Sequence, residues 1–135
     1  MSKRRRIEGI AGTTLDFILE VSKSYHPYEF IGMLSADGDV ISDVLLLPGM
    51  LSSDRNASIR LDMMPLGISY IGSVHNHPYP GPGAERPSAQ DLFIFARTGN
   101  CHIITFYPYD GDCWRCYNSK GEERGLKIME IEDRG

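Results

Sequence analysis

The stretch that decides the fold is Ser73-Val74-His75-Asn76-His77-Pro78, followed after a loop by Pro87-Ser88-Ala89-Gln90-Asp91-Leu92. Alternate residues of a strand share a face, so His75 and His77 direct both imidazoles to one side. Pro78 ends the strand, and Pro87-Ser88 predicts the start of a helix. Asp91 then falls in the first turn of that helix, where its carboxylate can turn back toward the histidines. Two ring nitrogens, one carboxylate and an open fourth position are typical of a catalytic zinc site.

Each part of this pattern has a simpler explanation when it is taken alone. A single histidine on a strand is more often a core residue than a metal ligand. Ser88-x-x-Asp91 matches a capping box, in which the serine caps the helix and the acid bonds back to it. Taken separately, those structural roles are the better interpretation. The full order of H-x-H-P, a turn-rich loop and P-S-x-x-D is far more specific, and it makes these residues a candidate metal centre.

The composition is that of one soluble globular domain spanning residues 1–135, with 41% hydrophobic and 24% charged residues. We expect residues 1–7 and 132–135 to be flexible tails. No apolar run approaches the roughly 20 residues of a membrane helix. The basic N-terminus, Lys3 to Arg6, has no long apolar segment after it and is not a secretory signal. We therefore expect a cytoplasmic protein with no membrane partner.

Charge and cysteine content exclude two further classes. A formal charge of −4 argues against nucleic acid as a partner, and Lys3 to Arg6 is interpreted as a solvated tail. The three cysteines are Cys101, Cys113 and Cys116, an odd number that does not indicate a disulfide scaffold. Cys113 and Cys116 have C-x-x-C spacing, but residues three apart in a strand lie about 10 Å from each other. That exceeds the roughly 7 Å limit for a disulfide, so we interpret the spacing as incidental.

Hydrophobic periodicity and turn residues predict the order of the elements. A helix is expected over residues 14–24, with Thr13 or Thr14 as its N-cap and His26-Pro27 at its end. Asp37-Gly38 and Asp110-Gly111 predict hairpin turns. Strands are predicted over residues 29–35, 40–47, 57–61, 68–77, 102–107, 113–118 and 126–131, and a second helix over 88–97. This order predicts a mixed α/β domain, in which one curved sheet is flanked by helices.

The chain resembles the JAMM (MPN+, or JAB1/MPN) metalloprotease family, whose motif is an upstream Glu, then H-x-H-P, then S-x-x-D. The segment Pro27-Tyr28-Glu29-Phe30-Ile31-Gly32 is similar to the family's P-x-E-x-x-G segment, which makes Glu29 the matching acid. The order of elements resembles the family over nearly the whole chain. The short length is similar to that of a minimal stand-alone archaeal or bacterial member, and the resemblance implies a cytidine deaminase-like α+β fold.

Two features depart from the family pattern. Asn76 stands between the histidines where the family usually has Ser or Thr, as it does in RadC-like members. Ten residues, Pro78 to Pro87, separate His77 from Ser88, which is longer than the usual spacing. Extra residues in a Pro/Gly loop can bulge outward without moving either end. The departure therefore concerns the substrate-facing loop more than the ligands.

The resemblance implies a zinc-dependent isopeptidase that cleaves the bond after the C-terminal glycine of a ubiquitin-like protein. It implies that His75, His77 and Asp91 hold one Zn²⁺ per chain. Glu29 would be the general base and later the acid, and Ser88 would donate a hydrogen bond to the oxyanion. The sequence leaves open whether Ser88 is cap, donor or both. Residues 57–61 and 79–86 are candidate walls of a groove for the substrate tail.

Alternatives of other kinds remain open at this point. The chain could be a JAMM or RadC-like relative that hydrolyses a different amide, for example one that releases a thiol or an amino acid from a small carrier protein. It could instead be a non-catalytic MPN scaffold, although all five motif positions are filled. Nitrogen and carboxylate ligands also accept iron or nickel. The oligomeric state is open, with a homodimer as one option. His26 is expected at the surface or as a cap, and His102 as a core or edge residue.

Overall fold

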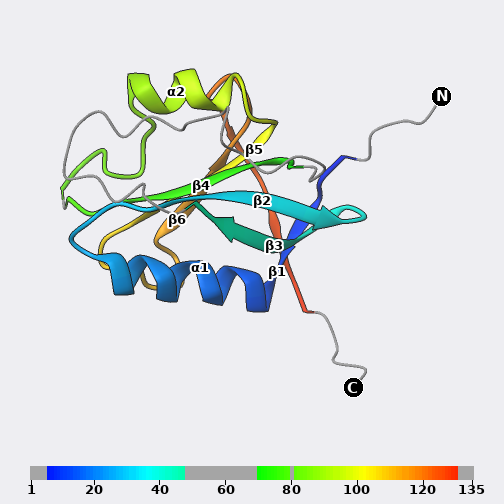
Figure 1. The fold of residues 1–135 in the computed structure, drawn as a ribbon, viewed down its shortest axis with the longest axis horizontal. Coiled ribbons are helices and arrows are strands. Elements are labelled where there is room, and N and C mark those ends of the chain that lie inside the picture. Colours follow the sequence, from blue (N-terminus) through cyan, green and yellow to red (C-terminus); the bar gives the residue numbers. More distant parts are fainter. Residues whose placement is uncertain (1–5, 48–69, 80, 131–135) are drawn as a thin grey trace.

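The strand that carries the two histidines lies inside the sheet rather than at its edge. The computed structural model describes residues 6–47, 70–79 and 81–130, and Figure 1 shows their arrangement. Along these residues the elements are β1 (Gly9–Ala11), α1 (Gly12–Tyr25), β2 (Ile31–Asp37), β3 (Val40–Leu46), β4 (Gly72–His77), α2 (Ala89–Phe95), β5 (Cys101–Phe106), β6 (Trp114–Tyr117), β7 (Glu123–Arg124) and β8 (Lys127–Met129).

These strands form one mixed sheet in the order β7-β6-β5-β4-β2-β3-β1-β8. β4 pairs antiparallel with β2, where Ile31 lies opposite His75, and parallel with β5, where Asn76 lies opposite Thr105. A parallel pair needs a crossover connection. Here the crossover from β4 to β5 contains α2, so the helix that follows the H-x-H strand returns across the sheet. The predicted mixed sheet flanked by helices is confirmed.

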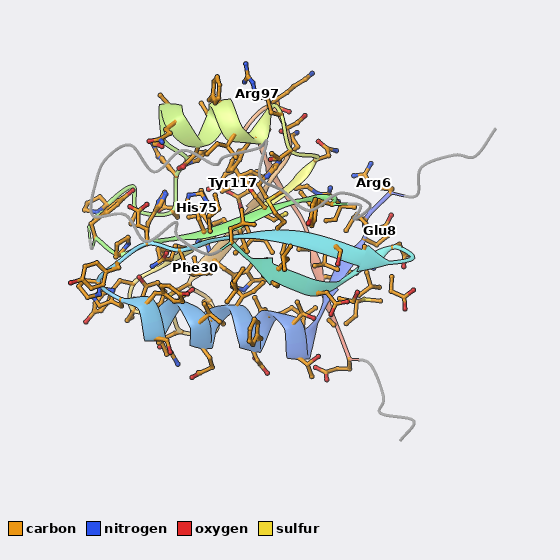
Figure 2. The ribbon with its side chains drawn as sticks, viewed as in Figure 1. Arg6, Glu8, Phe30, His75, Arg97 and Tyr117 are labelled. Carbon is orange, nitrogen blue, oxygen red and sulfur yellow. The ribbon has the colours of Figure 1, made fainter. Side chains whose placement is uncertain are left out.

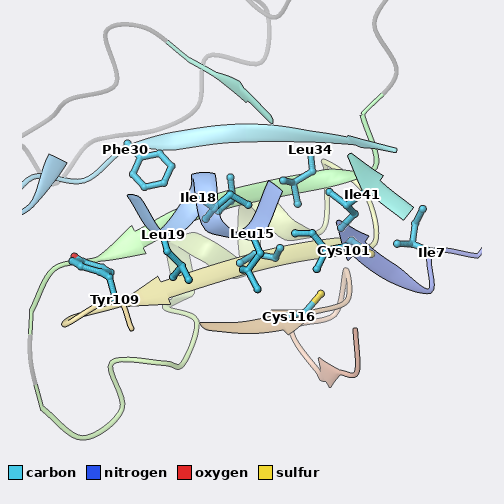
Figure 3. Packing of buried hydrophobic residues seen from close by; sticks show 13 residues of the cluster. Ile7, Leu15, Ile18, Leu19, Phe30, Leu34, Ile41, Cys101, Tyr109 and Cys116 are labelled. Atoms are coloured by element: carbon cyan, nitrogen blue, oxygen red, sulfur yellow. The ribbon is translucent and has the colours of Figure 1, made fainter. Parts of the chain in front are cut away.

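The two helices cover opposite faces of the sheet (Figure 1). On the α1 side, Leu15 and Ile18 pack against sheet residues that include Val74 and Ile103. Figure 3 shows 13 residues of this cluster between the helix and the strands. On the α2 side, Phe95 packs with Ile104 and Tyr117. Because strand residues alternate between faces, the odd-numbered histidines of β4 point toward α2, and Val74 and Asn76 point toward α1.

Helix α1 forms as its apolar spacing predicts, but it begins without the expected cap. Its buried positions, Leu15, Ile18, Leu19 and Ser22, recur at helical intervals. The N-cap residue is Ala11, and no side chain caps the helix there. The prediction of Thr13 or Thr14 as N-cap is therefore wrong. The Thr14 hydroxyl instead donates to the main-chain carbonyl of Ser42 on β3, at 2.9 Å, so a tertiary contact takes the group that a cap would use.

Some predictions on local structure need correction, and others fall outside the described residues. The short strands β1 and β7 were not predicted, and Ile7, placed by the sequence in a flexible tail, is buried in the core. The strand expected over 57–61 lies outside the residues that the structure describes. In the described part of the chain, neither helix has the length and hydropathy needed to span a membrane.

Candidate metal centre

The side chains of His75, His77 and Asp91 converge on one point between β4 and α2. The two Nε2 atoms are 3.0 Å apart. The Asp91 carboxylate places one oxygen 3.1 Å from Nε2 of His75 and the other 3.1 Å from Nε2 of His77. All three residues are buried. In Figure 2, His75 lies on the α2 side of the sheet and Phe30 on the α1 side, as strand alternation requires.

The orientation of the His77 ring is set by its second nitrogen. Nδ1 lies 2.7 Å from the main-chain carbonyl oxygen of Ala84. Because a carbonyl can only accept, Nδ1 carries the hydrogen, and in the neutral ring Nε2 is left with its lone pair facing His75 and Asp91. Histidines that bind metals usually donate their other ring N–H to a carbonyl or carboxylate in this way. The loop after Pro78 thus presents the ring as a ligand.

Asp91 is held in place by the start of α2. The Ser88 hydroxyl oxygen accepts a hydrogen bond from the Asp91 main-chain N–H at 3.1 Å, and the Ser88 N–H donates to the Asp91 carboxylate at 2.8 Å. This is the capping box expected from Ser88-x-x-Asp91. The reciprocal bonds satisfy main-chain donors of the first turn and aim the carboxylate back at β4. One side chain therefore serves the helix terminus and the candidate metal centre together.

Electrostatics in the cluster favour an ionised carboxylate. Burial acts to raise the pKa of Asp91, but the charge of His75 and hydrogen bonds from His75, His77 and the Ser88 main chain hold it well below its usual range. For His77, burial acts to lower the pKa, whereas the hydrogen bonds to Asp91 and Ala84 and the charges of Asp91 and Glu29 raise it above 6.5. A negative site that attracts protons to its nitrogens also attracts a metal cation.

The donor set and its spacing fit zinc. Tetrahedral ligands that lie about 2.0–2.1 Å from zinc are roughly 3.3 Å from one another. The two Nε2 atoms are 3.0 Å apart, and each lies 3.1 Å from a different oxygen of the Asp91 carboxylate. Taking one atom from each residue, the donors all lie within 4.8 Å of one another, so small side-chain movements bring them to that arrangement. Two imidazoles and one carboxylate also leave a coordination position for water or substrate. The three side chains fit one Zn²⁺ per chain, as expected from the sequence.

Glu29 and Ser88 lie beside this cluster. Glu29 is half-buried and sits just before β2, the strand that pairs Ile31 with His75. Its carboxylate acts on the pKa values of both His77 and Tyr79, which places it within electrostatic reach of the centre. Ser88 is exposed at the α2 terminus, where a substrate can approach it. The structure therefore brings all five predicted site residues to one end of β4.

His102 forms part of the support behind the centre and is not one of its ligands. It is fully buried, and its ring stacks on Phe95 with centroids 4.3 Å apart. Nδ1 accepts from the Ser73 main-chain N–H at 3.2 Å, so Nε2 carries the hydrogen and donates to the Gly99 carbonyl at 2.9 Å. Phe95 in turn lies 6.4 Å from the His75 ring. The expected core role of His102 is confirmed.

Two contacts at the centre were missed by the sequence analysis. The Ala84 carbonyl that orients His77 is a main-chain group, so the residue type at that position does not indicate its role. Tyr79 stacks on His77 with centroids 5.1 Å apart and is 48% exposed. An aromatic residue directly after H-x-H-P could have indicated such a stack, because a chain that turns at proline folds back over its last strand residues. The long loop thus contributes both an anchor and an aromatic cover for His77.

Known proteins resemble this chain in sequence and in fold. Residues 13–117 match the family of prokaryotic homologs of the JAB domain. A probable metalloprotease of Haloferax volcanii is 37% identical over 140 residues, covering 96% of this chain and 84% of the relative. A JAB1/MPN domain protein from Archaeoglobus fulgidus is 43% identical, with a TM-score of 0.73 over 90% of this chain and 99% of the other.

A second solved structure, described as JAMM, a metalloprotease-like zinc site in the proteasome and signalosome, is 40% identical. It aligns with a TM-score of 0.71 over 92% of this chain and 99% of the other. Sheet, helices and converging ligands together define a metal-dependent hydrolase domain with a single zinc site. The chain belongs to the prokaryotic JAB-domain family and is a JAMM/MPN+ metalloprotease domain.

Proposed function

We propose that this protein is a zinc-dependent isopeptidase that hydrolyses the bond between the C-terminal glycine of a ubiquitin-like protein and an amine. The observation that carries the proposal is the convergence of His75, His77 and Asp91 within 3.1 Å, with the Glu29 carboxylate acting on the same cluster. Metal ligands without a neighbouring free carboxylate would suit a structural ion. The extra acid is what a hydrolytic site requires.

The proposed roles follow from the position of each group. His75, His77 and Asp91 hold the zinc ion, which when bound supplies Lewis acidity that makes water a nucleophile near neutral pH. Glu29 lies beside the cluster and accepts a proton as water adds to the scissile carbonyl carbon. The C–N bond then breaks, and Glu29 returns the proton to the leaving amine. The products are a free carboxyl terminus and a free amine, so atoms and charges balance.

Ser88 serves the reaction without giving up its cap. Its oxygen accepts from the Asp91 N–H at 3.1 Å, which leaves its own hydrogen available. The exposed hydroxyl can donate that hydrogen to the carbonyl oxygen as negative charge develops there. In the proposed mechanism the serine is therefore both cap and donor.

The aromatic residue beside the centre supports an extended, glycine-rich substrate tail. Tyr79 stacks on His77 and is 48% exposed. Tyr28, directly before Glu29, is 56% exposed. A large exposed ring over a metal ligand favours a segment without side chains, as at the end of a ubiquitin-like protein. The related zinc site, described as metalloprotease-like, supports a protein substrate.

The general base is tested by Glu29→Gln in the zinc-loaded full chain. The amide keeps the shape of the side chain but cannot take a proton. We expect cleavage of an isopeptide-linked conjugate to fall at least about 100-fold, the scale of a lost general base. Zinc content, measured by atomic absorption, should stay near one per chain. Undiminished turnover would remove Glu29 from the proposed role.

The substrate class is tested by two conjugates of one carrier that ends in Gly-Gly, joined either to a lysine amine or to the amine of cysteine. Preferential release of lysine supports the isopeptidase. Preferential release of cysteine would favour the alternative hydrolase acting on a small carrier protein. A folded protein that holds zinc and cleaves neither conjugate would contradict the proposal.

A further inference from the structure

We infer that Asn76, the residue between the two metal-binding histidines, is the positioning residue that fixes Glu29 for catalysis. The inference rests on the proposed function, because it assigns Asn76 a part in the work of the general base. No motif position assigns Asn76 a role, and its side chain points away from the metal centre. Its effect on the reaction must therefore pass through the segment that carries Glu29.

The Asn76 amide binds both peptide units that flank the Glu29 α-carbon. Its Oδ1 accepts from the Phe30 main-chain N–H at 2.8 Å, and its Nδ2 donates to the Tyr28 carbonyl at 3.0 Å. One peptide unit joins Tyr28 to Glu29 and the other joins Glu29 to Phe30. Because Asn76 holds the carbonyl of the first peptide unit and the N–H of the second, it fixes the orientation of both peptide planes. These planes set the φ and ψ angles of Glu29 and therefore the direction of its side chain. A single side chain thus sets the direction of the catalytic carboxylate.

This support is needed because Glu29 lies outside the regular sheet. β2 begins at Ile31, whose partner on β4 is His75, so the ladder of main-chain hydrogen bonds ends one residue before Asn76. Beyond that point the Asn76 side-chain amide takes the place of main-chain groups of β4 and bonds to the main chain of residues 28–30. It is fully buried, so water does not compete for these bonds. Glu29 is therefore attached to the same strand that carries the metal ligands.

A second layer of contacts holds the Asn76 amide itself. Nδ2 also donates to the Tyr109 hydroxyl at 3.3 Å, and that oxygen lies 3.2 Å from Nδ1 of His26. Tyr109 is 2% exposed, and its ring packs edge-on against His26 with centroids 5.6 Å apart. Figure 3 shows Tyr109 and Phe30 at the same end of the core. The amide is thus braced on the α1 side of the sheet, while the chemistry takes place on the α2 side.

Asn76→Ala removes both bonds to the Glu29 segment. Displacements of about 1 Å can cost on the order of 100-fold in rate, so we expect kcat to fall roughly 10- to 100-fold. KM and zinc content should change less than about twofold, since neither the metal ligands nor Tyr79 loses a contact. Asn76→Thr fills more of the space and keeps a polar atom that can reach only one of the two peptide units, so its kcat should fall between wild type and Ala.

A double-mutant cycle separates positioning from general destabilisation. If Asn76 acts through Glu29, then adding Asn76→Ala to Glu29→Gln should lower the residual kcat by less than about twofold. Thr105→Val is the matched control. Thr105 lies opposite Asn76 on β5 and is equally buried. The valine variant loses the 2.7 Å hydrogen bond between Thr105 and Ser22 and keeps both bonds from Asn76 to the Glu29 segment. We expect it to lower stability and to leave kcat within twofold of wild type.

Hydrogen exchange at the Phe30 amide gives a readout that needs no activity. This N–H donates to Asn76 Oδ1, so its protection should fall at least tenfold in Asn76→Ala and stay near wild type in Thr105→Val. A wild-type protein that holds zinc but cleaves no conjugate would contradict the proposed function, while the exchange result would still report on the attachment of the segment. Additive losses in the cycle, or faster Phe30 exchange with unchanged kcat, would overturn the positioning role.

Discussion

The four histidines of this chain show how neighbours decide what one residue type does. His75 and His77 turn Nε2 toward a carboxylate and toward each other, at separations of 3.0 to 3.1 Å. His102 contacts a serine, a main-chain carbonyl and an aromatic ring, and is fully enclosed. His26 closes α1 and stacks on Tyr107 with ring centroids 4.8 Å apart. The negative carboxylate is what makes a histidine here a ligand rather than a packing residue.

The buried His102 should make the protein less stable in acid. Burial lowers the pKa of His102 to about 4, with partial compensation from the Gly99 and Phe95 main chain. In the unfolded chain its pKa is about 6.5, so between these values the unfolded state binds a proton that the folded state does not. The stabilisation is complete above pH 6.5 and is lost as the pH falls toward 4. Between pH 6.5 and the acid limit below pH 4, protonation of His102 should lower the free energy of unfolding by roughly 3 kcal/mol.

The measurement compares wild type with His102→Gln by urea unfolding at several pH values. Both proteins lose the contributions of the metal ligands in acid, so their difference isolates His102. We expect the stability advantage of wild type to shrink between pH 6.5 and 4 and to stay level above that window. A difference that does not vary with pH would mean that His102 is not held neutral in the fold.

At the scale of elements, the first turn of α2 joins helix stability to catalysis. Ser88→Ala removes the cap, which should cost about 1 kcal/mol in the free energy of unfolding. Ser88→Gly preserves most of the capping preference and should cost only a few tenths of a kcal/mol. Both variants lack the hydroxyl, so in the proposed mechanism both lose about 10²–10³ in kcat. Chemical denaturation and single-turnover cleavage measure the two quantities on the same samples.

The comparison of these two variants identifies the role of Ser88. If the hydroxyl only capped the helix, activity would follow stability and Ser88→Gly would remain close to wild type. Equal loss of kcat in both, despite unequal loss of stability, assigns the hydroxyl to the reaction. Zinc content serves as the control, because Asp91 keeps its two contacts with the histidines in either variant.

Helices and strands with a local sequence signal could be predicted, whereas strands that form only by pairing with a neighbouring strand could not. The H-x-H strand, the capped helix α2 and the hairpin at Gly38 carry local signals in the sequence: histidines two residues apart, a capping box and an Asp-Gly pair whose glycine adopts a φ of 67° in the structure. β1 and β7 are only three and two residues long. Segments that short have no periodicity, and they are strands only because β3, β8 and β6 lie beside them.

The same distinction applies to the candidate site. Side chains that act by residue type, such as His75, His77 and Asp91, could be predicted from their spacing. The Ala84 carbonyl could not, because every residue has a carbonyl and only the folded loop decides which one meets His77. Asn76 was noticed only as a departure from the family motif. Asparagine is disfavoured inside strands, so its presence there was a signal that its amide is used.

On the scale of the whole molecule, the sheet separates two layers that the metal should couple. The α1 side holds the large core cluster, whereas α2 packs through its own Phe95 against Ile104 and Tyr117 of the sheet. Helix α2 has only seven residues, which is too short to be stable without tertiary support. A cation shared by β4 and Asp91 adds a strong tie between this helix and the sheet. Zinc should therefore stabilise the native state as well as support catalysis.

Zinc removal should lower the unfolding temperature measurably. A ligand that binds only the native state adds about 2.7 kcal/mol at a free concentration of 100 times its Kd. For a chain of this size that corresponds to a Tm shift on the order of 10 °C. Scanning calorimetry with buffered zinc and with chelator measures the shift, and Glu29→Gln should show it in full. His75→Ala should show almost no zinc-dependent shift in Tm, because only His77 and Asp91 remain as ligands. A wild-type Tm indifferent to zinc, or a shift that persists in His75→Ala, would mean that the ion does not bind where β4 meets α2.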